Sequence, residues 1–496
     1  MSGAGLLRRS EVRMLPDTTR VVTRPFLPGQ EAHTHGISRA ESVVDRIMEL
    51  GEAEVALALS SVLTSFAGRH SDLEQTFREH FALVAHRVPM WPDLSRDRIT
   101  LIGAYLTLEY SIEGAALFNP AIIAHPDQSG CADGELRFLM SVRAVGEGHM
   151  SSVEFRTGIV GPHDVIALDI PGGDLSPGVV TPGLMSVDFL REALDMHGDA
   201  FDAESLLQHL PDMFLPSELE EVLTSTALDS PLNSGSDGLL ERIRRTAAST
   251  YRLRFSAGYH LSERVIMPTS AAESHGLEDV RLVEFRETDG TITYFGTYTA
   301  YDGSHIAPHF MRTDDFLTFD FGPMMGPAAH NKGMALFPRR IGGLMWTLSR
   351  WDRENISIAS SIDGIRWESP AVLVTPRRAW DLVQVGACSS PIETSQGWLV
   401  FTHGVGPMRV YSIGVVLLDL DDPTRVIGVI DAPVLSPESD ERDGYVPNVL
   451  YSCGALIHGN SVVLPYGCSD ATIRFAFIDL AQLLSQFHPP RRSEQP

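Results

Sequence analysis

The chain has 496 residues, of which 43% are hydrophobic and 21% are charged, so it is expected to be globular and to bury a large core. Acidic side chains outnumber basic ones by 64 to 39, and the formal net charge of -25 disfavours nucleic acid and anionic membrane as partners of the surface as a whole. An anionic substrate would therefore need a local cluster of basic residues.

The cysteines are too far apart in sequence for a zinc site or a disulfide framework, which predicts reduced thiols in the core: Cys131, Cys388, Cys453 and Cys468. The first residues lack an apolar stretch of signal-peptide length, and no run approaches the roughly twenty apolar residues of a membrane span. We therefore expect a cytoplasmic protein that needs neither a metal nor an organic cofactor.

Residues 1–112 are predicted to form a lead-in followed by a helical segment. Apolar residues spaced by three and four indicate helices between about Ser38 and Val88, and Ser38 followed by Glu41 fits a capping box. The apolar faces of these helices are suited to pairing subunits, so a homo-oligomer is a candidate state. Just before them, His33 and His35 have a spacing that suits a metal-ligand pair, although a solvated loop is the favoured interpretation.

Residues 113–482 have the pattern of a mainly β domain. Short apolar runs separated by Gly, Pro and Asp predict strands, among them 136–143 and 151–158. The helical pattern returns at about residues 188–251, and because strands resume directly afterwards we expect a helical insertion within the β domain. Residues 483–496 are predicted to be a polar tail.

A short repeat suggests the architecture of this domain. The segments 314–319 and 361–368 each place an Asp in a polar turn a few residues before an aromatic residue, and they lie roughly fifty residues apart, about the length of one propeller blade. The span has room for about five blades. The fold class predicted is a mainly β, five-bladed β-propeller with an N-terminal helical segment and a helical insertion; a β-sandwich is the alternative.

The segment 275–285 carries the most suggestive chemistry. Asp279 and Arg281 are two residues apart in an alternating run, so on a regular strand they point to the same side, with Glu278 beside them. A carboxyl group next to a guanidinium can have a controlled pKa, as a general acid requires. A structural ion pair at a strand end is the competing interpretation.

Several short motifs follow one another between about Phe118 and Asp470: Phe118-Asn119-Pro120, Ser141 to Arg143, Leu277-Glu278-Asp279-Val280-Arg281, Asn331 to Pro338, Pro391 to Thr394, Gly397-Trp398-Leu399, Thr402-His403-Gly404 and Tyr466 to Asp470. In this order and spacing they resemble glycoside hydrolase family 130, whose members are five-bladed propellers that phosphorolyse or hydrolyse β-mannosides. Val280 stands where the family usually has Pro.

The resemblance implies a role for each matching residue. Asp279 would donate the proton to the leaving sugar by way of a hydroxyl of the bound mannosyl unit, and Arg281 would be its structural neighbour. Arg143 and Asp470 would hold mannosyl hydroxyls, and Asn119 would lie near the attacking anion. Lys332 and Arg350 would belong to a cluster that binds phosphate. His403 and Tyr411, on the inner strands of one expected blade, are candidates to line the sugar site, and a buried core histidine is the competing interpretation of His403.

Glu393 decides between the two reactions at the level of sequence. It stands in the motif where the resemblance places a third basic residue, and a carboxylate there would repel phosphate and could activate a water molecule instead. An ion pair with Lys332 or Arg350 is the competing interpretation. We therefore expect inverting hydrolysis of terminal β-mannosides, with phosphorolysis by inorganic phosphate as the alternative and a non-catalytic glycan-binding propeller as a remote third.

Overall fold

The computed structural model describes the chain except for residues 1–4, 29–37, 89–92, 196–198, 230–235 and 492–496, so the His33 and His35 pair lies outside the described residues. The protein is mainly β with added helices, as predicted from the sequence. Two compact units are present: residues 1–16, 115–171 and 177–496 form the larger, and residues 17–114 and 172–176 the smaller.

The smaller unit combines a two-stranded sheet with a group of helices. Strand β2 (Val21–Pro25) pairs antiparallel with β3 (Thr107–Ser111). The helices are α1 (Arg39–Met48), α2 (Glu52–Phe66), α3 (Leu73–Val84) and α4 (Arg96–Tyr105). The capping box predicted at the start of α1 is confirmed, because the Ser38 hydroxyl accepts from the Glu41 N–H at 3.2 Å and the Glu41 carboxylate accepts from the Ser38 N–H at 2.6 Å.

In the larger unit the two ends of the chain share a sheet. Strand β1 pairs with β29, which continues to β28 and β26, and β27 pairs with β28. Residues 7–14 therefore belong with the β domain, whereas the sequence placed them in the N-terminal segment; the pairing partner lies more than 450 residues away and leaves no local pattern. The bounds are β1 (Leu7–Met14), β26 (Leu450–Tyr451), β27 (Leu456–His458), β28 (Ser461–Cys468) and β29 (Thr472–Asp479).

The largest sheet consists of two antiparallel groups that are joined where Gly276 pairs with Ser151. The first group contains β4 (Ala116–Ala124), β5 (Leu136–Val145), β6 (Ser151–Gly161), β7 (Val165–Leu168) and β12 (Val265–Ile266). The second contains β8 (Val179–Pro182), β11 (Tyr251–Arg254), β13 (Gly276–Arg286), β14 (Ile292–Tyr301), β15 (Ile306–Thr313) and β16 (Thr318–Pro323). The turn between β13 and β14 holds Asp289, which accepts from the Thr291 N–H at 2.9 Å, and Gly290, whose φ of +89° suits glycine.

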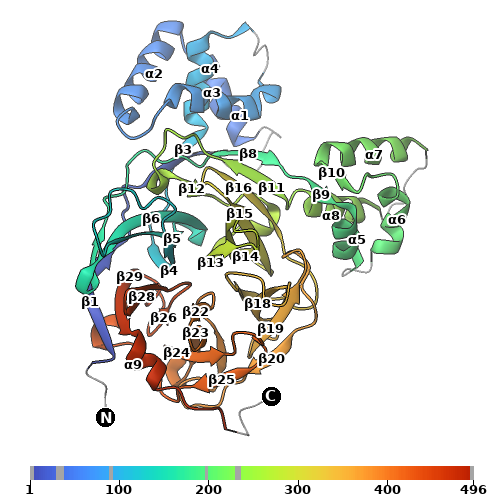
Figure 1. Cartoon of the computed structure of the whole chain (residues 1–496). Helices are drawn as coiled ribbons and strands as arrows, with labels where there is room; N and C mark the ends of the chain where they lie inside the picture. Colours follow the sequence, from blue (N-terminus) through green and yellow to red (C-terminus); the bar gives the residue numbers. More distant parts are fainter. Residues whose placement is uncertain (1–4, 29–37, 89–92, 196–198, 230–235, 492–496) are drawn as a thin grey trace. The chain divides into compact units, whose positions relative to one another are not determined.

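Two further antiparallel sheets complete the larger unit, and Figure 1 shows its sheets arranged around a common centre. One contains β17 (Lys332–Leu336), β18 (Met345–Arg350), β19 (Ile356–Ser361) and β20 (Ala371–Val374). The other contains β21 (Gln384–Ala387), β22 (Ile392–Thr394), β23 (Gly397–Val405), β24 (Tyr411–Leu418) and β25 (Val426–Val429). Buried apolar side chains fill the spaces between sheets, so the strands that carry polar residues at the centre are held rigidly.

The repeated Asp turns have the same geometry in two different sheets. The Asp315 carboxylate accepts from the N–H groups of Leu317 and Thr318 at 2.8 Å each. The Asp363 carboxylate accepts in the same way from Ile365 at 2.8 Å and Arg366 at 2.9 Å. These side chains replace missing backbone partners in a tight turn, which explains why the motif recurs at one position of successive sheets.

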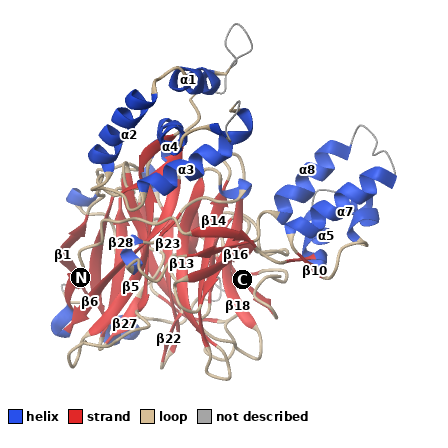
Figure 2. Cartoon of the chain, turned by 90° about the horizontal axis from the view of Figure 1, so that it is seen from above, coloured by secondary structure: helices blue, strands red, loops and turns tan. Residues whose placement is uncertain are grey.

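The helical insertion contains α5 to α8, which lie where the sequence predicted helices and share one apolar core. Figure 2 shows α1 to α4 as one group of helices and α5 to α8 as another. A short sheet of β9 and β10 lies within the insertion. The bounds are β9 (Met185–Ser186), α5 (Val187–Asp195), α6 (Ala200–Leu207), β10 (Met213–Phe214), α7 (Pro216–Asp229) and α8 (Ser236–Ala247).

The start of the expected polar tail is part of the folded unit. Helix α9 (Leu480–Ser485) buries Leu483 and Leu484, and His488 forms a bridge with Val429. Three of the four cysteines are buried free thiols, whereas Cys131 is partly exposed and therefore not the core residue that was expected. Among the described helices, none combines the length and apolar character that crossing a bilayer would require.

Candidate active site

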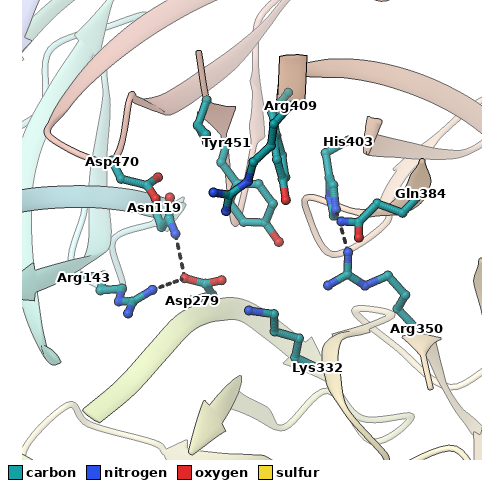
Figure 3. A pocket seen from close by; sticks show the side chains of 12 residues that line it. Asn119, Arg143, Asp279, Lys332, Arg350, Gln384, His403, Arg409, Tyr451 and Asp470 are labelled. Atoms are coloured by element: carbon teal, nitrogen blue, oxygen red, sulfur yellow. Dashed lines mark hydrogen bonds and ion pairs between the residues drawn. The ribbon is translucent and has the colours of Figure 1, made fainter. Parts of the chain in front are cut away.

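A cavity of about 120 Å³ lies among the polar residues that the sheets of the larger unit present to their common centre (Figure 3). Strands from each of these sheets contribute to it, together with the turns beside them. The lining residues are Asn119, Arg143, Asp279, Lys332, Arg350, Gln384, His403, Arg409, Tyr411, Val449, Tyr451 and Asp470. Eight residues predicted from the sequence are thus brought together, and the ninth, Glu393, is not.

Asp279 occupies a bulge of β13. Its φ is +56°, and the pairing with β14 shifts register between Glu278 and Arg281. A bulge breaks the alternation of side chains along a strand. The expectation that Asp279 and Arg281 face the same space is therefore wrong, because Asp279 lines the cavity whereas Arg281 is 2% exposed and does not.

Arg281 connects three strands in the interior. Its guanidinium donates to the carbonyl of Asp279 at 3.1 Å, to the carbonyl of Ala387 at 3.2 Å and to the hydroxyl of Tyr451 at 2.6 Å. These contacts join β13, β21 and β26 behind the lining residues. A buried guanidinium with several acceptors is stably charged, so Arg281 contributes both rigidity and positive potential to the site.

The Asp279 carboxylate is held by two donors. The Asn119 amide donates to it at 2.6 Å and the Arg143 guanidinium at 3.3 Å (Figure 3). Asn119 also has a left-handed backbone, with φ of +50°, in a bulge of β4, so two irregular strands bring this pair together. Burial acts to raise the pKa of Asp279, but Arg143, Lys332, Arg281 and the Asn119 hydrogen bond outweigh burial and hold the pKa below its usual value.

A second carboxyl group lines the same cavity. Asp470 follows β28 with φ of +49°, and Figure 3 shows it on the side of Asn119. Burial, together with the charge of Asp279, raises the pKa of Asp470 to about 6, although Arg143, Arg409 and Lys332 reduce the rise. The two carboxyl groups therefore differ in proton affinity, and the one beside the stronger cation field is the more acidic.

Lys332 and Arg350 place positive charge across the cavity from Asp470. They face each other in the pairing of β17 with β18, and the register of that pairing shifts just after Lys332. The Arg350 guanidinium donates to Nε2 of His403 at 3.1 Å. Among the described residues no carboxylate lies within 4.0 Å of Arg350, so its charge is available to an anion in the cavity.

His403 is neutral in this setting. Burial and the charges of Arg350, Arg281 and Lys332 lower its pKa well below the usual value, and as the acceptor from Arg350 its Nε2 carries no proton. The imidazole stacks on the Tyr411 ring with centroids 5.8 Å apart. Gly386 lies opposite His403 in the sheet, and a Cβ there would come within 2.4 Å of the imidazole, so glycine makes room for it.

Glu393 lies outside the cavity, so the expectation that it belongs to the site is wrong. On β22 its carboxylate accepts two hydrogen bonds from Arg339, at 2.7 and 2.8 Å, and its side chain is 45% exposed. The hydrogen bond from Arg339 lowers the pKa of Glu393. The sequence predicted an ion pair as the competing interpretation but with Lys332 or Arg350, neither of which is the partner.

Gln384, Arg409, Tyr451 and Val449 line the cavity but were not predicted. Gln384 begins β21, two residues before Gly386, and an uncharged amide at a strand start has no distinctive pattern. Arg409 lies in the 3-10 turn Pro407–Arg409, with φ of +57°, and in sequence it is indistinguishable from a surface arginine. The described residues contain no group of three or more His, Cys, Asp or Glu side chains arranged to hold a metal ion.

Comparison with known proteins places this geometry in context. The profile of the glycoside hydrolase family 130, described as beta-1,4-mannooligosaccharide phosphorylase, matches residues 258–488. A beta-1,2-mannobiose phosphorylase from Thermoanaerobacter sp. is 31% identical over 244 residues, which cover 46% of this chain and 78% of that protein. The chain belongs to glycoside hydrolase family 130. The family assignment made from the sequence motifs is thereby confirmed.

A second relative agrees with this assignment, and one solved structure is also similar. The beta-1,2-mannobiose phosphorylase of Listeria innocua is 30% identical over 253 residues, covering 49% of this chain and 69% of that protein. A solved structure of the Listeria innocua enzyme in complex with beta-1,2-mannobiose aligns with a TM-score of 0.44 and 21% identity, covering 76% of this chain and 92% of that chain. The family match begins at residue 258, so the helical insertion lies before it.

We expect the substitution Glu393→Gln to leave turnover of a β-mannoside within about twofold of wild type. Glu393 is half-exposed and bound to Arg339, and exposed ion pairs contribute at most about 1 kcal/mol to the free energy of unfolding. Steady-state turnover and urea unfolding of the variant and wild type test this. A loss of turnover above tenfold with an unchanged free energy of unfolding would show that Glu393 takes part in the reaction.

Proposed function

We propose that this protein is a β-mannoside phosphorylase, which cleaves a terminal β-mannoside with inorganic phosphate and releases mannose 1-phosphate. The observation that supports phosphorolysis most directly is the presence of Lys332 and Arg350 in the same cavity as Asp279, with Glu393 elsewhere. The sequence favoured hydrolysis because Glu393 was expected to activate water. Because Glu393 lies outside the cavity, it no longer supports hydrolysis. The names of the relatives agree with phosphorolysis.

In the proposed reaction an oxygen of phosphate forms a bond to C1 of the mannosyl unit while the bond from C1 to the leaving oxygen breaks. The leaving sugar takes a proton, and attack from the opposite face inverts the configuration at C1. We assign the proton to Asp279, which could pass it through a hydroxyl of the bound mannosyl unit. The basic residues would stabilise the negative charge of the phosphate, and the phosphate would in turn stabilise the positive charge that develops on the sugar ring.

The mannosyl unit would lie between the two sides of the cavity. Arg143 can donate to sugar hydroxyls and Asp470 can accept from them, so together they satisfy both halves of a hydroxyl's hydrogen bonding. Asn119 was expected near the attacking anion; because its amide donates to Asp279, we assign it to holding the acid. Phosphate would bind Lys332 and Arg350, with His403, Tyr411 and Gln384 beside them.

The low pKa of Asp279 fits a binding order in which phosphate assists the acid. Without a ligand, Arg143 and Lys332 favour the ionised form of Asp279 over the protonated form that a proton donor needs. A phosphate dianion bound to Lys332 would offset the charge of that cation, and proton uptake by Asp279 would become easier. Phosphate would then act both as nucleophile and as a counter-charge.

The sheets are best interpreted as a five-bladed propeller. Apart from the short sheet of β9 and β10 in the insertion, the described strands of the larger unit pair into four sheets, and the largest consists of two antiparallel groups, which makes five groups around one centre. The recurring Asp turns and the pairing of β1 with β29 at the ends of the chain support this interpretation.

The experiment that tests the proposal is incubation with β-1,2-mannobiose and with β-1,4-mannobiose, each with and without inorganic phosphate. We expect mannose 1-phosphate and free mannose in equal amounts, only when phosphate is present. Release of mannose at the same rate without phosphate would show a hydrolase. Oligosaccharide binding without turnover in either condition would favour a non-catalytic propeller.

A further inference from the structure

Glu278 precedes Asp279 and lies against two of the same cations, although it does not line the cavity. One carboxylate oxygen of Glu278 accepts from Arg143 at 2.6 Å, and the other lies 3.7 Å from the Lys332 ammonium. The same Arg143 guanidinium reaches Asp279 through its other terminal nitrogen at 3.3 Å. The bulge at Asp279 permits this, because on a regular strand consecutive side chains point to opposite faces.

We propose that Glu278 is a positioning residue for the reaction: its carboxylate holds Arg143 and Lys332 and offsets their charge, so that Asp279 can carry the proton that it donates. The inference deepens the proposed function and rests on it. Glu278 touches neither of the expected substrates, and it acts through the two cations.

The balance of charge around Asp279 determines whether loss of the Glu278 charge raises or lowers the pKa of Asp279. The titratable or charged groups that face Asp279 from the packed elements are Glu278, Arg143, Arg281, Lys332, Asp470, Tyr451, Cys388 and Cys453. Three of these are cations, and among them Arg143 and Lys332 contact Glu278. Without the Glu278 charge, both cations would act on Asp279 with less compensation, and the proton would be lost at lower pH.

The position of Glu278 also orients Arg143. The Arg143 guanidinium lies 5.0 Å from the centre of the Phe118 ring while Glu278 and Asp279 each bind one of its terminal nitrogens. The side chain of Glu278 is 14% exposed, so its charge is only weakly screened by solvent. A strong hydrogen bond at this depth makes the direction of the Arg143 guanidinium depend on Glu278.

The substitution Glu278→Gln tests this, because it removes the charge and keeps the shape. We expect the alkaline limb of the kcat profile to move about one unit to lower pH, which lowers kcat roughly tenfold on that limb. The KM for phosphate should fall about two- to tenfold, since Lys332, which is assigned to phosphate, is less neutralised. Glu284→Gln is the matched control: Glu284 lies on the same strand and pairs with Arg286 at the surface, at 2.8 Å, so its profile should coincide with wild type.

The charge-retaining variant Glu278→Asp separates charge from structure and covers the case in which Glu278→Gln does not fold. Its alkaline limb should stay within about 0.3 units of wild type even where kcat falls. The proposal is overturned if the limb of Glu278→Gln does not move, if its phosphate KM rises, or if the limb of Glu278→Asp moves by a full unit. If the wild-type protein releases no mannose 1-phosphate, the proposed function itself is wrong. If the wild-type protein releases mannose 1-phosphate but the alkaline limb of Glu278→Gln does not move, only the role proposed for Glu278 is wrong.

Discussion

The substitution Asp279→Asn should reduce phosphorolysis of β-mannobiose by about 10²- to 10⁴-fold, the usual contribution of a general acid. Asparagine has nearly the same shape, so the bulge of β13 and the contact with Asn119 can persist, but an amide has no proton to give at neutral pH. The loss should fall on kcat more than on KM, because the proton moves only in the transition state. Initial rates of mannose 1-phosphate release measure both parameters.

The matched control for that experiment is Asp289→Asn. Asp289 lies in the turn that follows the same strand, where its carboxylate accepts from the Thr291 N–H, and it does not line the cavity. We expect normal turnover from this variant. If Asp279→Asn retained more than a tenth of wild-type kcat, the acid would have to be another group, and Asp470 would be the next candidate because its pKa is raised to about 6 in the same cavity.

The substitution Arg350→Gln should raise the KM for phosphate about 10- to 100-fold, the effect of losing one charged hydrogen bond worth about 1.5–3 kcal/mol. Arg350 is buried at the cavity wall and its charge has no carboxylate partner within 4.0 Å among the described residues, so an anion is the natural counterpart. Initial rates over a range of phosphate concentrations measure the effect. Binding of the mannoside should change much less, because Arg143 and Asp470 lie on the other side of the cavity (Figure 3).

Arg339→Gln provides the control for the loss of an arginine. Arg339 binds Glu393 and stacks on Trp398 at 4.9 Å, and it does not line the cavity, so its removal should leave the phosphate KM unchanged. A phosphate KM that is equally raised in both variants would indicate a general effect of charge. An unchanged KM in Arg350→Gln would place the phosphate elsewhere and remove the main support for phosphorolysis.

Local patterns in the sequence were sufficient to predict many of the helices, strands and turns. The capping box at Ser38 and Glu41 and the recurring Asp turns each involve residues within a few positions of one another, and such interactions leave a readable pattern. The resemblance to the family predicted eight of the twelve lining residues, and most of these lie in motifs that are short runs on one strand or turn.

Tertiary structure alone placed Glu393 outside the cavity and Gln384 and Arg409 at its wall. Glu393 and Gln384 are nine positions apart, yet Gln384 lines the cavity and Glu393 binds Arg339, since the direction of a side chain depends on the register of its strand within the sheet. The bulge at Asp279 likewise turned Arg281 into the interior and brought Glu278 to Arg143. Register shifts and left-handed turns at Asn119, Asp279 and Asp470 are imposed by neighbouring sheets, and a linear pattern of residue types does not encode them.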